Sequence, residues 1–239
     1  MGTAVLFDVR DLGFDDRVVD DAVAYLNRIE SIFSTYRGDS EISRIRDGRL
    51  SISDADPLVR EVLDTCDRLT TETAGAFDHR SGGELDPAGY VKGWAIERAA
   101  RILVDGGVES FLISAGGDVV ARGTPPGRGV WTAGIRDPLN PDAVLGTVDL
   151  RDSAIATSGR YERGDHIWGT AGESEMLSGV SVLGHDLGIA DALATAVFSA
   201  RLSDAVWLNR FPDYDLIAVT TDRRVLRSPT APFTAATTT

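Results

Sequence analysis

The 239-residue chain carries 37 acidic and 24 basic residues, a formal net charge of −13, and 43% of its residues are hydrophobic. That much apolar material suits one large domain or two closely packed halves, and the negative field argues against binding to nucleic acid. No apolar run could span a membrane, and the first eight residues lack the features of a secretory signal. Because Cys66 is the only cysteine, no internal disulfide can form, and we expect a cytoplasmic protein.

In the first half of the chain, the spacing of apolar residues predicts one strand and three helices. Asp56 and Pro57 open the second helix, as a cap followed by proline in the first turn. Two glycines in succession end the third helix. The predicted elements cover residues 3–9 (strand), 15–33 (helix), 56–69 (helix) and 89–107 (helix with its closing glycines).

After the third helix the apolar period changes to two, which is typical of strands separated by Gly, Pro, Asn and Asp turns. Strands are predicted over residues 111–113, 119–121, 130–135, 144–148 and 216–220, and a helix over residues 191–200. Helices and strands do not alternate regularly, so we predict an α+β fold with mixed or antiparallel sheets and packed helices. We expect one domain over residues 1–225 and a flexible tail over 226–239.

Four polar clusters interrupt the core-forming pattern, at residues 74–78, 85–95, 113–118 and 190–196. Most of them have a structural explanation. A Gly-Gly-Asp sequence between strands is commonly a hairpin turn, and an Asp followed by Pro and Gly commonly caps a helix. Taken singly, each cluster therefore indicates a turn or a cap as readily as a functional site.

The fourth cluster places a carboxylate and a hydroxyl on one face of an apolar helix. Asp191 and Thr195 are four residues apart and are surrounded by Ala, Leu, Val and Ile. Asp191 could cap the helix. Alternatively, both oxygens could bind Mg²⁺, which prefers oxygen ligands and keeps substrate phosphates among them. From these residues alone, the cap and the metal site remain equally open.

The ordered clusters resemble the signature motifs of the FAD:protein FMN transferases, the ApbE family. Seven motifs follow one another from the first residue to about residue 200. They are Met1-Gly2-Thr3, Ser34-Thr35-Tyr36 with Ser40-Glu41-Ile42-Ser43, Gly75-Ala76-Phe77-Asp78, Asp86 with Gly89 and Lys92-Gly93, Ala115-Gly116-Gly117-Asp118, Ser158-Gly159-Arg160-Tyr161, and Ala190 to Ala196.

The resemblance implies an ApbE-like, T-fold-related architecture and a set of site residues. It implies metal ligands at the Gly89 carbonyl, Asp191 and Thr195, which would bind Mg²⁺. It implies flavin contacts at Met1, Tyr36, Ala76, Phe77, Asp78, Asp86, Gly116, Gly117 and Asp118. A divalent ion would also let an acidic protein bind a diphosphate.

The resemblance also implies a catalytic role for Asp191 and for His166, the latter as a base. The loop that begins at His166 departs from the family pattern, since its Asp-Pro-Arg portion is missing and only Thr170 and Gly172 match. Lys92, where members often carry Lys or an acidic residue, could be a solvated charge in the first turn of its helix. The departure at His166 leaves the catalytic competence of that loop open.

The resemblance implies an enzyme that uses FAD and Mg²⁺. It would transfer FMN from FAD to a Ser or Thr hydroxyl of an acceptor protein and release AMP. Two alternatives remain. Water could replace the acceptor, which would make the protein an FAD pyrophosphatase that yields FMN and AMP, or the chain could bind flavin without catalysis.

Overall fold

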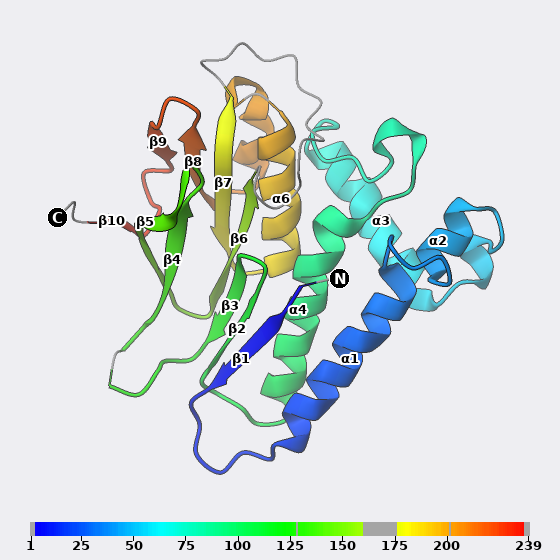
Figure 1. Ribbon diagram of the computed structural model, residues 1–239, viewed down its shortest axis with the longest axis horizontal. Helices are drawn as coiled ribbons and strands as arrows, with labels where there is room; N and C mark the ends of the chain where they lie inside the picture. Colours follow the sequence, from blue (N-terminus) through cyan, green and yellow to red (C-terminus); the bar gives the residue numbers. More distant parts are fainter. Residues whose placement is uncertain (1–2, 128, 160–175, 201, 237–239) are drawn as a thin grey trace.

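The structure, a computed structural model, describes residues 3–127, 129–159, 176–200 and 202–236. Helices cover one face of a large antiparallel sheet, and a small sheet covers the other face (Figure 1). This arrangement confirms the α+β prediction. In the described part of the chain, no helix combines the length and apolar composition that a bilayer span requires.

The large sheet has seven strands in the order β1-β2-β3-β6-β7-β8-β9, and every neighbouring pair is antiparallel. The small sheet has the order β10-β5-β4. The strands are β1 (Val5–Val9), β2 (Phe111–Ala115), β3 (Asp118–Arg122), β4 (Trp131–Asp137), β5 (Asn140–Leu150), β6 (Ser153–Gly159), β7 (Leu177–Gly184), β8 (Asp215–Thr220), β9 (Val225–Arg227) and β10 (Phe233–Ala235).

In the helical layer, α4 (Ala88–Asp105) packs against both α1 (Arg17–Phe33) and α6 (Leu187–Ser199). The helices are α1 (Arg17–Phe33), α2 (Glu41–Arg46), α3 (Pro57–Glu72), α4 (Ala88–Asp105) and α6 (Leu187–Ser199), with short 3₁₀ turns η1 (Ile52–Asp54), η2 (Ser81–Gly83) and η4 (Leu202–Arg210). The predicted start of α3 is confirmed, because Pro57 is its first residue and the Asp56 carboxylate accepts a hydrogen bond from the amide of Leu58.

Two apolar cores hold the layers together. The larger core lies between the helices and the seven-stranded sheet and includes Ile96, Phe111 and Leu193. The smaller core fills the space between the sheets, around Trp131 and Leu150. Since alternate residues of a strand point to opposite faces, the large sheet is apolar on both faces and supports both layers.

The C-terminal strands differ from the expected tail. β9 pairs with β8, and β10 pairs with β5, within the stretch predicted to be flexible from residue 226. The ring of Phe233 lies against Gly146 of β5, where a Cβ would approach it within 2.5 Å. The aromatic side chain and the space left by glycine explain why this segment adds a strand to the small sheet.

Candidate active site

The first cluster of predicted site residues lies where the start of α4 meets α6. A Cβ built at Gly89 would lie 3.1 Å from Oγ1 of Thr195 and 3.4 Å from the Phe77 ring. Phe77 is buried, and its amide donates a hydrogen bond of 3.0 Å to Oγ1 of Thr73 at the end of α3. Two neighbouring motifs, which contain Phe77 and Gly89, therefore meet the much later motif that contains Thr195.

Asp191 lies in the same region and does not cap its helix. α6 begins four residues earlier, and its cap is Asp186, whose carboxylate accepts a hydrogen bond of 3.0 Å from the amide of Ile189. Asp191 is only 1% exposed, and its Oδ2 accepts a hydrogen bond of 3.0 Å from the amide of Gly93 in α4. The capping alternative is therefore wrong, because Asp191 joins two helices instead of starting one.

Gly93 must be glycine for these helices to approach so closely. A Cβ at this position would lie 2.4 Å from the carbonyl oxygen of Leu187 and 2.9 Å from Cβ of Asp191. The sequence signal was the Lys-Gly pair early in a helix, where glycine costs stability and so indicates a packing or functional reason.

The Gly-Gly-Asp turn joins this region through Asp118. Gly116 and Gly117 both have positive φ, 53° and 87°, and connect β2 to β3, as the hairpin explanation predicted. Asp118 is fully buried, and its Oδ2 lies 2.9 Å from Nζ of Lys92. The solvated-charge explanation of Lys92 is therefore wrong: its side chain is only 24% exposed and forms an ion pair with a buried carboxylate.

The charges of this region act on one another. Burial raises the pKa of Asp118 to about 8, the negative charge of Asp191 adds to the rise, and Lys92 opposes it. The charges of both Asp191 and Lys92 therefore act on the Asp118 carboxyl. Perturbed, buried acids of this kind cluster at functional sites.

The segment expected to contact flavin connects α3 to α4. Asp78 and Asp86 are exposed, and each carboxylate accepts a main-chain amide, from Arg80 at 2.8 Å and from Ala88 at 3.0 Å. Ala76 is half-buried. The segment is held by main-chain bonds, including the amide of Asp86 to the carbonyl of His79 at 2.8 Å, so both carboxylates lie at the protein surface in fixed loops.

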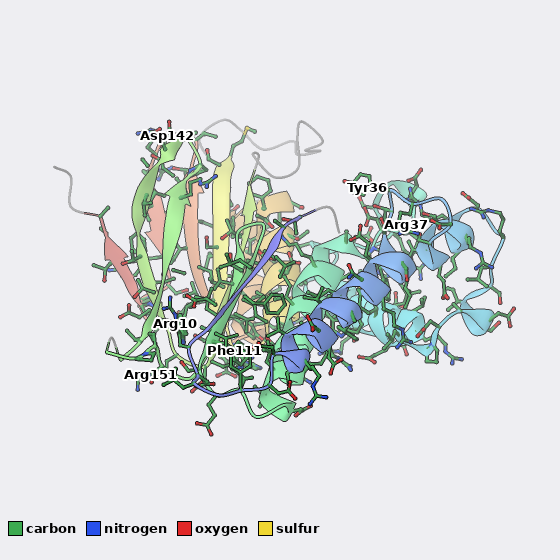
Figure 2. The ribbon with its side chains drawn as sticks, turned by 60° about the horizontal axis from the view of Figure 1, so that its bottom comes forward. Arg10, Tyr36, Arg37, Phe111, Asp142 and Arg151 are labelled. Atoms are coloured by element: carbon green, nitrogen blue, oxygen red, sulfur yellow. The ribbon has the colours of Figure 1, made fainter. Side chains whose placement is uncertain are left out.

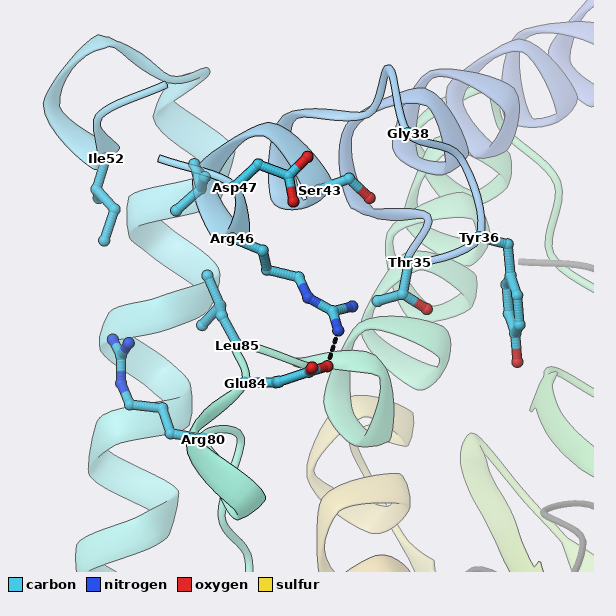
Figure 3. Close-up of a pocket in the computed structure, with 12 residues that line it drawn as sticks. Thr35, Tyr36, Gly38, Ser43, Arg46, Asp47, Ile52, Arg80, Glu84 and Leu85 are labelled. Atoms are coloured by element: carbon cyan, nitrogen blue, oxygen red, sulfur yellow. Dashed lines mark hydrogen bonds and ion pairs between the residues drawn. The ribbon is translucent and has the colours of Figure 1, made fainter. Parts of the chain in front are cut away.

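Tyr36 follows α1 and lies on the helical side of the molecule, far from Asp142 of the small sheet (Figure 2). It borders an open pocket of about 710 Å³. Figure 3 shows Tyr36 at one rim, Arg80 at the other side, and an ion pair between Arg46 and Glu84 within it. The remaining lining residues are Thr35, Gly38, Ser43, Ile45, Asp47, Ile52, Gly83 and Leu85.

Two predicted residues, Met1 and His166, lie outside the described residues. The neighbouring Thr3 is described, and its Oγ1 would lie 2.9 Å from a Cβ at Gly116, so the opening motif and the hairpin turn are adjacent. The core of the candidate site consists of Gly89, Phe77, Asp191 and Thr195. Asp118 forms an ion pair with Lys92 of the same helix as Gly89, and Tyr36 borders the pocket.

The donor chemistry of this core fits a hard divalent cation. The core contains a carbonyl oxygen at Gly89, a carboxylate at Asp191 and a hydroxyl at Thr195, and oxygen ligands of this kind suit magnesium. No group of three or more His, Cys, Asp or Glu residues that could hold a metal occurs in the described part of the chain. A metal at this site would thus depend on a mixed donor set and on phosphate oxygens from a ligand.

These features define an α+β protein in which two buried carboxylates, Asp118 and Asp191, lie near the contact of α4 with α6. The model of the ApbE family matches residues 1–83 and 79–218, and the chain belongs to that family.

Curated relatives carry the name FAD:protein FMN transferase. The protein from Treponema pallidum is 29% identical over 214 residues, which cover 75% of this chain and 58% of the relative. The protein from Rhodobacter capsulatus is 33% identical over 164 residues, which cover 63% of this chain and 31% of the relative. The chain therefore spans less than two thirds of the length of these relatives.

Solved structures share the fold along nearly the whole chain. The flavin transferase ApbE from Vibrio cholerae has a TM-score of 0.78 at 20% identity and covers 95% of this chain and 94% of its own. The ApbE protein from Thermotoga maritima has a TM-score of 0.77 at 20% identity with the same coverage. These matches confirm the predicted architecture.

Proposed function

We propose that the protein transfers FMN from FAD to a Ser or Thr hydroxyl of an acceptor protein, with release of AMP and dependence on Mg²⁺. One observation carries the proposal: Gly89, Asp191 and Thr195, two of them about a hundred residues from the first, meet at the contact of α4 with α6. The names of the curated relatives support the same activity.

Different residues of the site would bind the metal ion and the flavin. The Gly89 carbonyl, the Asp191 carboxylate and the Thr195 hydroxyl would hold Mg²⁺, which when bound neutralises charge on the diphosphate. The amide of Gly93 fixes the Asp191 carboxylate for that task. Tyr36, Phe77 and the carboxylates of Asp78 and Asp86 would bind and orient FAD, in part along the pocket beside Tyr36.

The reaction is a displacement at the FMN phosphorus. The acceptor oxygen forms a bond to that phosphorus, and the bond from phosphorus to the bridging oxygen of the anhydride breaks, so that AMP leaves with the oxygen. The hydroxyl proton must pass to a base. His166, which lies outside the described residues, stays our prediction for that role, with Asp191 as the catalytic carboxylate.

The test is incubation with FAD, Mg²⁺ and a protein acceptor that bears a reactive threonine. We expect the acceptor to gain the mass of FMN while AMP appears in equal amount. Free FMN in place of the modified acceptor would assign the site to FAD hydrolysis instead. A protein that binds FAD but consumes none of it with Mg²⁺ would be a flavin-binding protein, and transfer would be rejected.

A further inference from the structure

Two ion pairs of opposite polarity connect α4 to β3. Near the start of the helix, Lys92 pairs with Asp118 at 2.9 Å. Five residues further along α4, the buried Glu97 pairs with Arg122 at the other end of β3. Glu97 also accepts a hydrogen bond of 3.2 Å from the amide of Leu187. Only the first pair lies beside the candidate active site, so the second offers an internal comparison.

Asp118 has no open surface with which to touch a ligand. It is 0% exposed; its Oδ1 accepts a hydrogen bond of 3.1 Å from the amide of Thr157 in β6, and its Oδ2 faces Lys92. A direct flavin contact by this side chain, as the family resemblance implied, would require the strands to open. Any influence of Asp118 on a ligand must therefore pass through another residue.

The position of Lys92 suits it to transmit the influence of Asp118 to a ligand. It lies three residues after Gly89 on α4, on the same helical face, and directly before Gly93, whose amide binds Asp191. Its side chain is partly exposed, whereas its buried partner is not. A lysine stem is flexible and strongly hydrated, so a fixed ammonium position requires an anchor. The buried carboxylate of Asp118 provides one.

We propose that Asp118 is a positioning residue that acts through Lys92, holding the lysine ammonium beside Gly89, Asp191 and Thr195, where it meets the diphosphate of FAD. The inference rests on the proposed function and adds a residue pair to it. The Lys92 ammonium and a divalent cation would both present positive charge to the diphosphate. A diphosphate then finds both a cation and an ammonium group in place before it binds.

The experiment compares Asp118→Asn, Lys92→Met, the double variant and Glu97→Gln. FAD affinity is measured by quenching of flavin fluorescence in EDTA, where no turnover occurs, and KM and kcat are measured with Mg²⁺. We expect each of the first two variants to bind FAD about tenfold more weakly, the loss of one charge-assisted contact. The double variant should bind FAD with the same affinity as Lys92→Met, because Asp118 has no effect on FAD that is separate from Lys92.

Glu97→Gln is the matched control, since it breaks the other buried pair between the same two elements. It should lower the melting temperature while FAD affinity stays at the wild-type value. If Asp118→Asn fails to fold, the double variant still tests the inference, because it leaves neither charge of this pair without its partner. Its FAD affinity has to match that of Lys92→Met.

Three results would overturn the inference: wild-type FAD affinity in Asp118→Asn, additive losses in the double variant, or an equal loss of affinity in Glu97→Gln. A wild-type protein that binds no FAD in EDTA or with Mg²⁺ is a different outcome, because it rejects the proposed function itself.

Discussion

The main-chain amide of Gly93 donates a hydrogen bond of 3.0 Å to Oδ2 of Asp191, and so joins α4 to α6 at the candidate active site. The two helices are close enough there that a Cβ at residue 93 would lie 2.4 Å from the carbonyl oxygen of Leu187. The backbone of one helix thus orients the functional carboxylate of the other, and the fold and the site depend on the same contact.

We expect Gly93→Ala to lower stability by about 1 to 3 kcal/mol, the usual cost of forcing extra atoms into a packed interior. In a chain of this size that is about 2 to 4 °C of melting temperature per kcal/mol. Thermal denaturation measures it. Gly134→Ala is the control, because the nearest atom to a Cβ there is 3.6 Å away. Equal melting temperatures of Gly93→Ala and the wild type would show that the helices separate easily.

Replacement of Asp191 by Asn tests the metal site while keeping the fold. An asparagine oxygen can still accept the amide of Gly93, but it lacks the charge that a divalent cation requires. We expect Mg²⁺ affinity, measured by titration calorimetry with FAD present, to fall at least about tenfold. AMP release should fall with it.

The control for this variant is Asp186→Ala, which removes the true cap of α6. It should cost about 1 kcal/mol of stability and leave Mg²⁺ affinity unchanged. Full Mg²⁺-dependent activity in Asp191→Asn would remove this carboxylate from the proposed site.

His79 lies in the segment between α3 and α4 and contacts Asp67 of α3, and its burial predicts that stability depends on pH. It is 2% exposed, with Nε2 3.3 Å from Oδ1 of Asp67, and burial lowers its pKa below the ordinary 6.5. The folded state favours the neutral imidazole of His79. The unfolded chain therefore takes up the proton more readily, and the free energy of unfolding decreases as the pH falls below about 6.5. Between pH 7.5 and pH 5, we expect the melting temperature of the wild type to fall more than that of His79→Gln. Parallel curves for the two proteins would contradict this assignment.

Sequence patterns predicted the ends of helices best where neighbouring residues alone decide the structure. Asp56 and Pro57 define the start of α3, and Gly106 caps the end of α4, because both depend on neighbouring residues alone. The start of α6 was placed four residues late, since Leu187 and Gly188 are buried among other elements and give no amphipathic period.

Contacts between distant segments could not be predicted in this way. Nothing near Lys92 in the sequence shows that β3 will bring Asp118 within 2.9 Å of it. β6 and β7 were not predicted, because small and hydroxyl-bearing residues such as Thr157 and Ser181, whose side chains hydrogen-bond at 2.9 Å, weaken the apolar alternation. Motif order predicted the residues of the candidate site, and packing decided which of them touch.

Tyr36 tests whether the pocket beside the 80–85 segment belongs to the flavin site. The side chain is 92% exposed, so its removal should change stability by less than about 0.5 kcal/mol. If its ring stacks on FAD, Tyr36→Ala should weaken FAD binding several-fold, since an aromatic contact contributes about 0.5 to 1.5 kcal/mol. Tyr36→Phe keeps the ring and should bind FAD as the wild type does. Leu12→Ala removes another fully exposed apolar side chain and should have no effect on FAD affinity. Unchanged affinity in Tyr36→Ala would place the flavin away from this rim, and the pocket would then lie outside the FAD site.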